Sequence, residues 1–181
     1  MTTARRIALL VVLATVGVAR TASAAGPLVF GDTKEGTMAL RVHPALQLKD
    51  AHGSSGASGR ITDSEGRRDA DVWGRAARWV DYSGRVAGRL QGIAVFDHPA
   101  NLRHPTRWHA RDYGLVAANP FGLHDFTGAP AGGGDHVIPA GGSLDLRYRV
   151  VLHLGDAEAA GIADRWRAWA EMPADTREPP P

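Results

Sequence analysis

The sequence predicts an all-β fold, an antiparallel β-sandwich that carries one C-terminal helix. Short segments with alternating apolar and polar residues recur along the chain, and connectors rich in glycine separate them. Only one stretch, near the C-terminus, shows helical spacing of its large apolar residues. Strands that follow one another without intervening helices are typical of sandwiches and not of βαβ folds.

Four segments are predicted as strands. Thr37–His43 alternates cleanly, and Ser143–Leu154 gives the strongest pattern. In the latter, one face holds Leu144, Leu146, Tyr148, Val150, Leu152 and Leu154, and the other holds Asp145, Arg147, Arg149 and His153. One dry face and one wet face are expected of a sheet packed on one side. Arg78–Tyr82 and Gly92–Phe96 are the other two strands, and the second is apolar on both faces, which predicts a central position.

Three connectors are predicted between these strands, at Lys49–Arg60, Ser83–Gly92 and Gly128–Gly142. Glycine and serine in them supply positive φ values and local hydrogen bonds. The run Gly132-Gly133-Gly134 follows no strand and opens no helix, so it does not indicate a phosphate-binding loop.

A helix is predicted after the last strand. Asp156 is the expected N-cap, and Ile162, Trp166 and Trp169 recur at helical spacing, while Pro173 ends the helix. Because two tryptophans share this apolar stripe, we interpret them as core anchors and not as a ligand platform.

The amino terminus has the pattern of an export signal. Arg5 and Arg6 precede an apolar stretch, Ile7–Val18, and Ala22-Ser23-Ala24 is a small-residue cleavage site. We therefore expect residues 1–24 to be a signal peptide, with the mature protein periplasmic or extracellular. Residues 25–172 are predicted as one β-sandwich domain and residues 173–181 as a disordered proline-rich tail. No later segment approaches the roughly 20 apolar residues of a membrane span.

The composition excludes several classes of function. Loss of Arg5, Arg6 and Arg20 with the signal leaves 18 basic against 19 acidic residues, so the mature charge is about −1. No basic run remains to follow a phosphate backbone, and nucleic acid is not an expected partner. The sequence has no cysteine, which excludes disulfides, thiolate metal sites and cysteine nucleophiles.

Chemistry-bearing residues are densest in Phe96–Leu115, which holds three of the eight histidines. Pro99 and Pro105 predict a long loop after the strand Gly92–Phe96. The predicted catalytic residues are Asp97, His98, His104, His109 and Arg111, with Glu35 as an added carboxylate. The predicted substrate-binding residues are Trp108, Tyr113, Arg103 and Asn119, which offer stacking surfaces and polar groups to a sugar.

Other interpretations of the segment remain open. The same residues would also supply the internal hydrogen bonds of a loop that only plugs one end of the sandwich. No metal or other cofactor is predicted, because the three histidines lack the spacing that places two imidazoles together on a helix. The turn Asp63–Gly66 is a weaker source of a carboxylate, since turn formation explains it. A G-x-S-x-G nucleophile elbow is absent from the sequence.

Several long motifs occur in order and carry a resemblance: GDTKEGTMALRV, DVWGRAARWVDYSG, GIAVFDHPANLRHPTRWHARDYGLVAANPFG and IPAGGSLDLRYRVVLHLGD. Together they resemble the carboxy-terminal half of the DUF6807 family, which also carries the label "methane oxygenase PmoA". The resemblance runs from about Leu28 to the helix near Trp169. It implies a soluble β-sandwich related to the mutarotase-like supersandwiches, in a family common among carbohydrate-degrading bacteria.

Three functional hypotheses follow. The first is an exported protein that binds or acts on a carbohydrate, and the second is a non-catalytic structural or interaction domain, or a truncated paralogue. The third is the metal-dependent oxygenase that the family label implies. Family members carry further strands before the DTKEG motif. The resemblance therefore implies either a shortened paralogue or gene-model fragment, or a second chain that supplies the other half of the sandwich.

Overall fold

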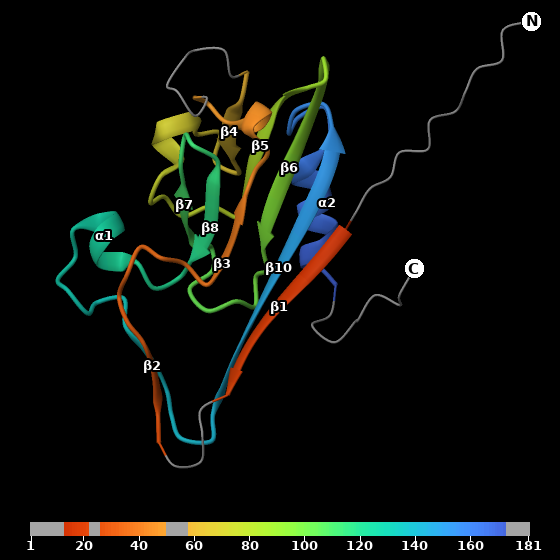
Figure 1. Ribbon diagram of the computed structural model, residues 1–181. Coiled ribbons are helices and arrows are strands. Elements are labelled where there is room, and N and C mark those ends of the chain that lie inside the picture. Colours follow the sequence, from red (N-terminus) through yellow and green to blue (C-terminus); the bar gives the residue numbers. More distant parts are fainter. Residues whose placement is uncertain (1–12, 22–25, 50–57, 173–181) are drawn as a thin grey trace, which may run out of the picture.

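The protein is built from two facing β-sheets, a two-stranded arm and a helix packed on the larger sheet (Figure 1). The computed structural model describes residues 13–21, 26–49 and 58–172. The larger sheet has the strand order β1 (Leu13–Thr21), β10 (Ser143–Leu154), β6 (Arg89–Asp97), β5 (Trp79–Val86) and β4 (Arg60–Asp63). Each neighbouring pair in it is antiparallel.

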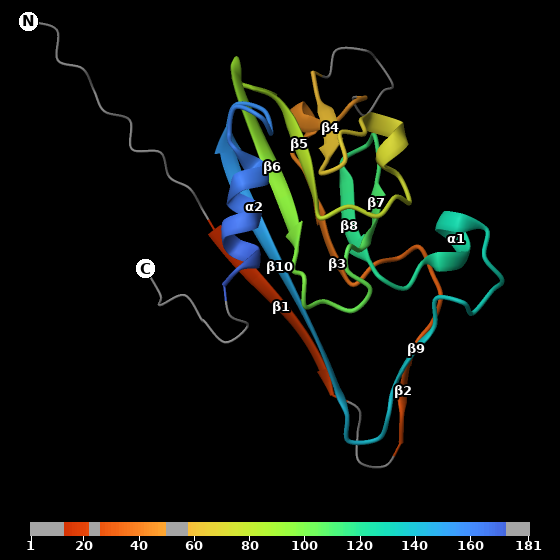
Figure 2. The same ribbon diagram turned by 180° about the vertical axis from the view of Figure 1, so that it is seen from behind.

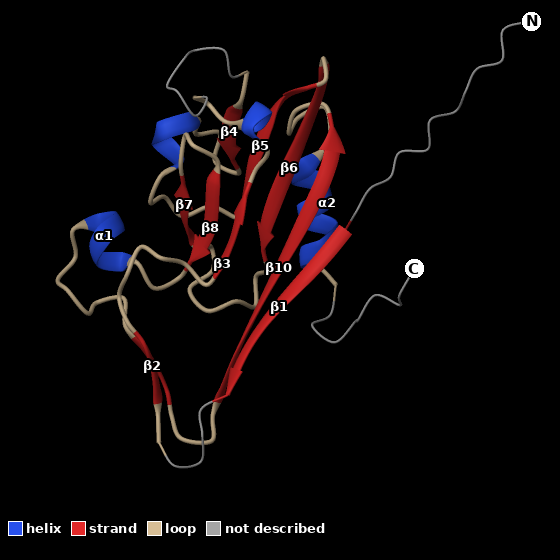
Figure 3. Cartoon of the chain, in the orientation of Figure 1, coloured by secondary structure: helices blue, strands red, loops and turns tan. Residues whose placement is uncertain are grey.

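The smaller sheet has the order β3 (Met38–Arg41), β8 (Leu115–Asn119) and β7 (Arg107–Ala110). The arm pairs β2 (Leu28–Phe30) with β9 (His136–Ile138) and extends away from both sheets (Figure 1). The helical segments are η1 (Pro44–Leu46), η2 (Asp69–Val72), α1 (Leu123–Thr127) and α2 (Ile162–Ala170). Strands dominate the described chain (Figure 3), which confirms the predicted all-β class with its C-terminal helix.

The main core lies between the two sheets. Tyr82 and Val95 from the larger sheet meet Trp108 and Val116 from the smaller sheet, and all four are buried. The indole N–H of Trp108 donates to the Ala77 carbonyl at 2.8 Å, which satisfies its one polar atom. These contacts fix how the smaller sheet sits on the larger one.

A second core lies on the opposite face of the larger sheet, where helix α2 packs (Figure 2). Phe96 and Val151 from the sheet meet Ile162 and Trp169 from the helix, and all four are buried. Strand β6 therefore has apolar contacts on both faces and lies centrally in its sheet, as predicted. Trp169 is fully buried, as expected of a core anchor, whereas Trp166 is only partly buried and packs against this core.

The predicted faces of β10 are correct only for its first half. Leu146 and Tyr148 point into the main core, but Arg149 and His153, expected on a wet face, are buried. The reason is that α2 and the turn before it cover that face. Leu152 and Leu154 are instead exposed at the far end of the strand.

Three predicted boundaries need correction. The connector Ser83–Gly92 is mostly strand, because β5 and β6 form a hairpin whose two turn residues, Ala87 and Gly88, have φ values of 49° and 77°. The connector Gly128–Gly142 contains β9, and α1 before it was not expected. Asp156 caps the turn that precedes α2 by accepting from Ala159 N at 2.9 Å, so it is not the N-cap of α2.

The predicted signal peptide overlaps a described strand. Residues 13–21 form β1 and pair with β10 from Leu13 opposite Val151 to Thr21 opposite Ser143. The predicted cleavage site and the proline-rich tail lie outside the described residues. No helix of the described chain is long and apolar enough to cross a membrane. Export remains a prediction from the sequence.

Candidate functional site

The histidine segment is not one irregular loop. Strand β7 lies inside it, because residues after Pro105 alternate between the two sides of the smaller sheet. Trp108 faces the main core while His109 lies on the other side of the strand, against Trp73 and Phe126. Because Arg107 and His109 are polar, the alternation of the strand was not recognised in the sequence.

Asp97 and His104 form an ordered pair at the end of β6. The buried Asp97 carboxylate accepts from Asn101 Nδ2 and from Thr106 N, both at 2.8 Å. His104 Nδ1 lies 2.7 Å from Asp97 Oδ2, so it donates to the carboxylate, and Nε2 is left as the basic nitrogen. The imidazole is parallel to the Trp166 ring, with ring centroids 6.1 Å apart. An imidazole oriented by a carboxylate is suited to acid–base chemistry.

His98 lies beside this pair but serves the fold. Its Nδ1 accepts from Ala100 N at 3.1 Å, and its ring packs edge-on against Trp169. Burial, followed by the charge of Arg147, lowers the pKa of His98. The side chain is therefore neutral near pH 7.

His109 lies elsewhere, against the segment that contains Glu35. Its Nδ1 donates to the Lys34 carbonyl at 3.0 Å, and burial lowers the pKa of His109. Glu35 is exposed and its charge acts on His109. The three imidazoles thus do not converge: His98 and His104 contact the tryptophans of α2, whereas His109 contacts Trp73 and Phe126. Within the described residues no group of three or more ligand-type side chains is arranged to hold a metal ion.

Two of the predicted substrate-binding residues support loops and the core. Trp108 has no exposed surface to offer a sugar ring, so its predicted stacking role does not fit its position. Asn119 is buried and holds Thr33 O, Phe121 N and Gly122 N. Both side chains have their polar atoms occupied by the backbone.

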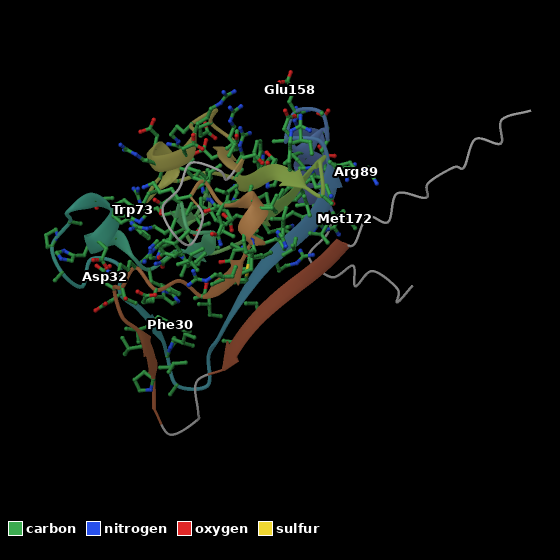
Figure 4. All side chains as sticks on the ribbon, turned by 45° about the horizontal axis from the view of Figure 1, so that its top comes forward. Phe30, Asp32, Trp73, Arg89, Glu158 and Met172 are labelled. Carbon is green, nitrogen blue, oxygen red and sulfur yellow. The ribbon has the colours of Figure 1, made fainter. Side chains whose placement is uncertain are left out.

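A cleft of about 650 Å³ opens where β7 ends, beside η2. The polar groups that line it come from Lys49, Asp69, Trp73, Arg111 and Asp112. Figure 4 shows Trp73 on the side of the body that faces α1, consistent with the edge contact of its ring with Phe126. The volume lies within the range of small-molecule sites, roughly 300–1,000 Å³.

Arg111 is held in the cleft through its backbone. The buried Tyr82 hydroxyl accepts from Arg111 N at 2.9 Å and donates toward Leu115 O at 2.9 Å. Burial raises the pKa of Tyr82, so the phenol stays protonated and keeps its donor. The guanidinium itself is exposed and lies 5.7 Å from the centre of the Tyr113 ring.

Trp73 and Asp69 also line the cleft. The Trp73 indole N–H is buried and has no hydrogen-bond partner among the described residues. Asp69 has a φ of 52°, an uncommon value for a residue with a Cβ, and its Oδ1 accepts from Ile61 N at 3.0 Å. Backbone conformations of this kind are held by the surrounding structure and concentrate at functional sites.

Asp112 is an ionised group on the cleft. Its carboxylate lies 2.9 Å from Lys49 Nζ, and this hydrogen bond is the main reason that the pKa of Asp112 is lowered. The Lys49 side chain is 64% exposed, so the ion pair is weak and open to competition by a ligand.

Sequence reasoning found Arg111 but missed Trp73, Asp69 and Lys49 as members of one site. Lys49, the segment Asp69–Trp73 and Arg111 lie far apart along the chain, and Lys49 begins a segment that the sequence predicts only as a connector. One feature of the sequence could have indicated this part of the cleft: the segment Asp69–Trp73 places a tryptophan close to two aspartates between predicted strands.

The fold and the cleft define a β-sandwich-like protein with a cleft at the end of β7, lined by Trp73 and several polar residues. A family model described as "Family of unknown function (DUF6807)" matches residues 11–167, and the chain belongs to this family. No curated protein and no solved structure matches the chain. The predicted relationship to mutarotase-like supersandwiches therefore stays a prediction.

Proposed function

We propose that the protein is exported and binds a carbohydrate in the cleft between Trp73 and Arg111. One observation carries the proposal: an indole, a guanidinium and two carboxylates line a single cleft of about 650 Å³. A cleft of this size accommodates about one to three sugar rings. Export is supported by the sequence pattern of residues 1–24.

The chemistry of the wall suits a saccharide. A sugar ring has an apolar C–H face that packs on an aromatic ring, and hydroxyls that both donate and accept hydrogen bonds. Trp73 supplies the aromatic ring. Asp69 and Asp112 supply acceptors, and Arg111 supplies a fork of donors.

Binding is better supported than turnover. The Asp97–His104 pair is the arrangement in the described chain best suited to acid–base chemistry, but neither residue lines the cleft. His104 contacts Trp166 of α2, whereas the cleft lies at the end of β7. A ligand in the cleft would not meet the His104 imidazole.

The test uses the full chain on an array of plant and microbial glycans, followed by calorimetry with the oligosaccharide that binds best. Trp73→Ala and Arg111→Met are expected to weaken binding about tenfold or more. The matched control is Arg89→Met, which removes an exposed arginine on the side of the molecule away from Trp73 (Figure 4). His104→Ala is expected to leave the affinity unchanged.

A second candidate function is a non-catalytic interaction domain that includes a second chain. The arm favours it, because Val29 and Val137 lie opposite each other and are 56% and 53% exposed. Two-stranded ribbons are marginally stable in water by themselves. This alternative predicts no glycan binding, together with a molar mass by light scattering at least twice that of the chain.

A further inference from the structure

A second hollow, of about 210 Å³, lies on the outer side of β7 next to the segment that follows β8. Its charged walls are Arg103 and Arg107, and its apolar walls include Pro105, Pro120 and Leu123. It shares no lining residue with the Trp73–Arg111 cleft. Nothing in the proposed carbohydrate binding uses it.

The two guanidinium groups are fixed but not neutralised. Arg103 donates to the carbonyls of Pro120, Gly134 and Asp135 at 2.6–2.9 Å, and Arg107 donates to the Gly74 carbonyl at 2.8 Å. All these acceptors are uncharged. Among the described residues neither arginine forms an ion pair with a carboxylate. Each guanidinium has five N–H donors, so both retain donors for another acceptor.

The carboxylates of Asp32 and Asp135 accept hydrogen bonds from backbone amides. Asp32 accepts from Gly134 N at 2.8 Å and from His124 N at 3.0 Å. Asp135 Oδ1 accepts from Asp32 N at 2.6 Å. These bonds tie Asp32 to residues 124, 134 and 135. Among the described residues, neither carboxylate forms an ion pair with Arg103 or Arg107.

The backbone at Arg103 is held in an uncommon conformation. Its φ is 58°, in the left-handed region that residues with a Cβ rarely adopt. The three carbonyl bonds of its side chain, across to residues 120–135, oppose relaxation of that conformation. A strained residue that delivers a fixed charge to a hollow is a feature of functional sites.

We propose that this hollow binds a small oxyanion: sulfate, phosphate or a carboxylate group. The planar forks of Arg103 and Arg107 match the geometry of tetrahedral and planar oxyanions. Apolar walls lower the local dielectric constant and strengthen the attraction. The site is separate from the carbohydrate cleft and does not depend on it.

The experiment titrates sulfate, phosphate and acetate into the full chain at constant ionic strength, with chloride as the balancing anion. The Nε–Hε NMR signals of Arg103 and Arg107 are expected to shift and saturate with a Kd of about 1 mM, the scale of two charge-assisted hydrogen bonds. Saturation by at least one of the three anions supports the site, and comparison of the three separates a phosphate-like from a carboxylate-like ligand. Chloride that shifts the signals equally would overturn it.

Four variants locate the site. Arg107→Met is expected to weaken oxyanion binding at least tenfold. Arg75→Met is expected to have no effect, because Arg75 is exposed next to the hollow-lining Ala76 and its side chain makes no hydrogen bond or ion pair in the described chain. Arg107→Lys keeps the charge and loses the fork, so it should bind more weakly than wild type. Trp73→Ala should bind sulfate normally, which separates this proposal from the carbohydrate cleft. Wild-type affinity in Arg107→Met would refute the proposal.

Discussion

The Tyr82 hydroxyl, buried between the two sheets, accepts a hydrogen bond from the backbone N–H of Arg111 at 2.9 Å. The same oxygen lies 2.9 Å from Leu115 O, so one phenol joins both sides of the turn between β7 and β8. This contact links the main core to the position of a cleft residue.

Tyr82→Phe is therefore expected to lower the free energy of unfolding by about 0.5–1.5 kcal/mol, because the buried hydroxyl and its hydrogen bonds are lost while the Arg111 N–H keeps the Leu115 carbonyl as an acceptor at 2.9 Å. It should also weaken binding in the cleft by loosening the turn. The matched control is Tyr148→Phe, since the Tyr148 hydroxyl is buried but makes no hydrogen bond of good geometry in the described chain. Urea denaturation of both variants checks the difference, and equal losses would contradict the role given to Tyr82.

A pH dependence is expected from His109, whose pKa is lowered by burial. The unfolded chain binds a proton near pH 6.5, and the folded chain binds it only at lower pH. The contribution of neutral His109 to the free energy of unfolding is therefore fully present above about pH 6.5. It is lost as the pH falls through the pKa of His109 in the folded protein. His109→Gln should show a smaller loss of stability between pH 7 and pH 5 than wild type. An identical pH profile would show that His109 does not titrate in this way.

His153 and Asp81 form a buried pair across the larger sheet, with Nε2 and Oδ1 2.6 Å apart. Burial raises the pKa of Asp81. Because removal of one partner leaves the other polar group buried alone, His153→Ala is expected to destabilise the fold by about 3–5 kcal/mol. The double variant Asp81→Ala/His153→Ala should lose clearly less than the sum of the two single variants. Additive losses in a denaturation cycle would exclude direct coupling of the two side chains.

The export prediction can be checked on the expressed protein. Cleavage at the predicted site would give a mature chain that begins at Ala25 and lacks β1, so β10 would become an edge strand. Intact-mass measurement of protein recovered from the periplasm or medium is expected to give the mass of residues 25–181. A chain that retains residues 13–21 in the cytoplasm would contradict the signal-peptide interpretation.

The sequence predicted the fold class because alternation is a local property. Thr37–His43 and Ser143–Leu154 show it directly, and both are strands. Alternation did not predict the burial of Arg149 and His153. Both side chains are buried because α2 covers their face of β10, and no pattern within β10 itself indicates this. Strand β7 was not predicted, because its outward positions are Arg107 and His109, and polar residues of this kind are also typical of loops.

The candidate site was predicted less well than the fold. The density of histidines along the chain predicts a single site. In the structure, His98 and His104 follow β6 and contact the tryptophans of α2, whereas His109 lies on β7 and contacts Trp73. Arg111 was found because it lies in the dense segment, whereas Trp73 and Lys49 reach the same cleft from segments more than 35 residues away in sequence. Only tertiary structure brings those segments together.

The most direct test of the carbohydrate proposal is the calorimetric affinity of the best-bound oligosaccharide for wild type, Trp73→Ala and the control Arg89→Met. The proposal predicts that Trp73→Ala, with its fold confirmed by circular dichroism, loses at least tenfold in affinity while Arg89→Met binds as wild type. Equal affinity of all three proteins, or no glycan bound by wild type, would contradict it.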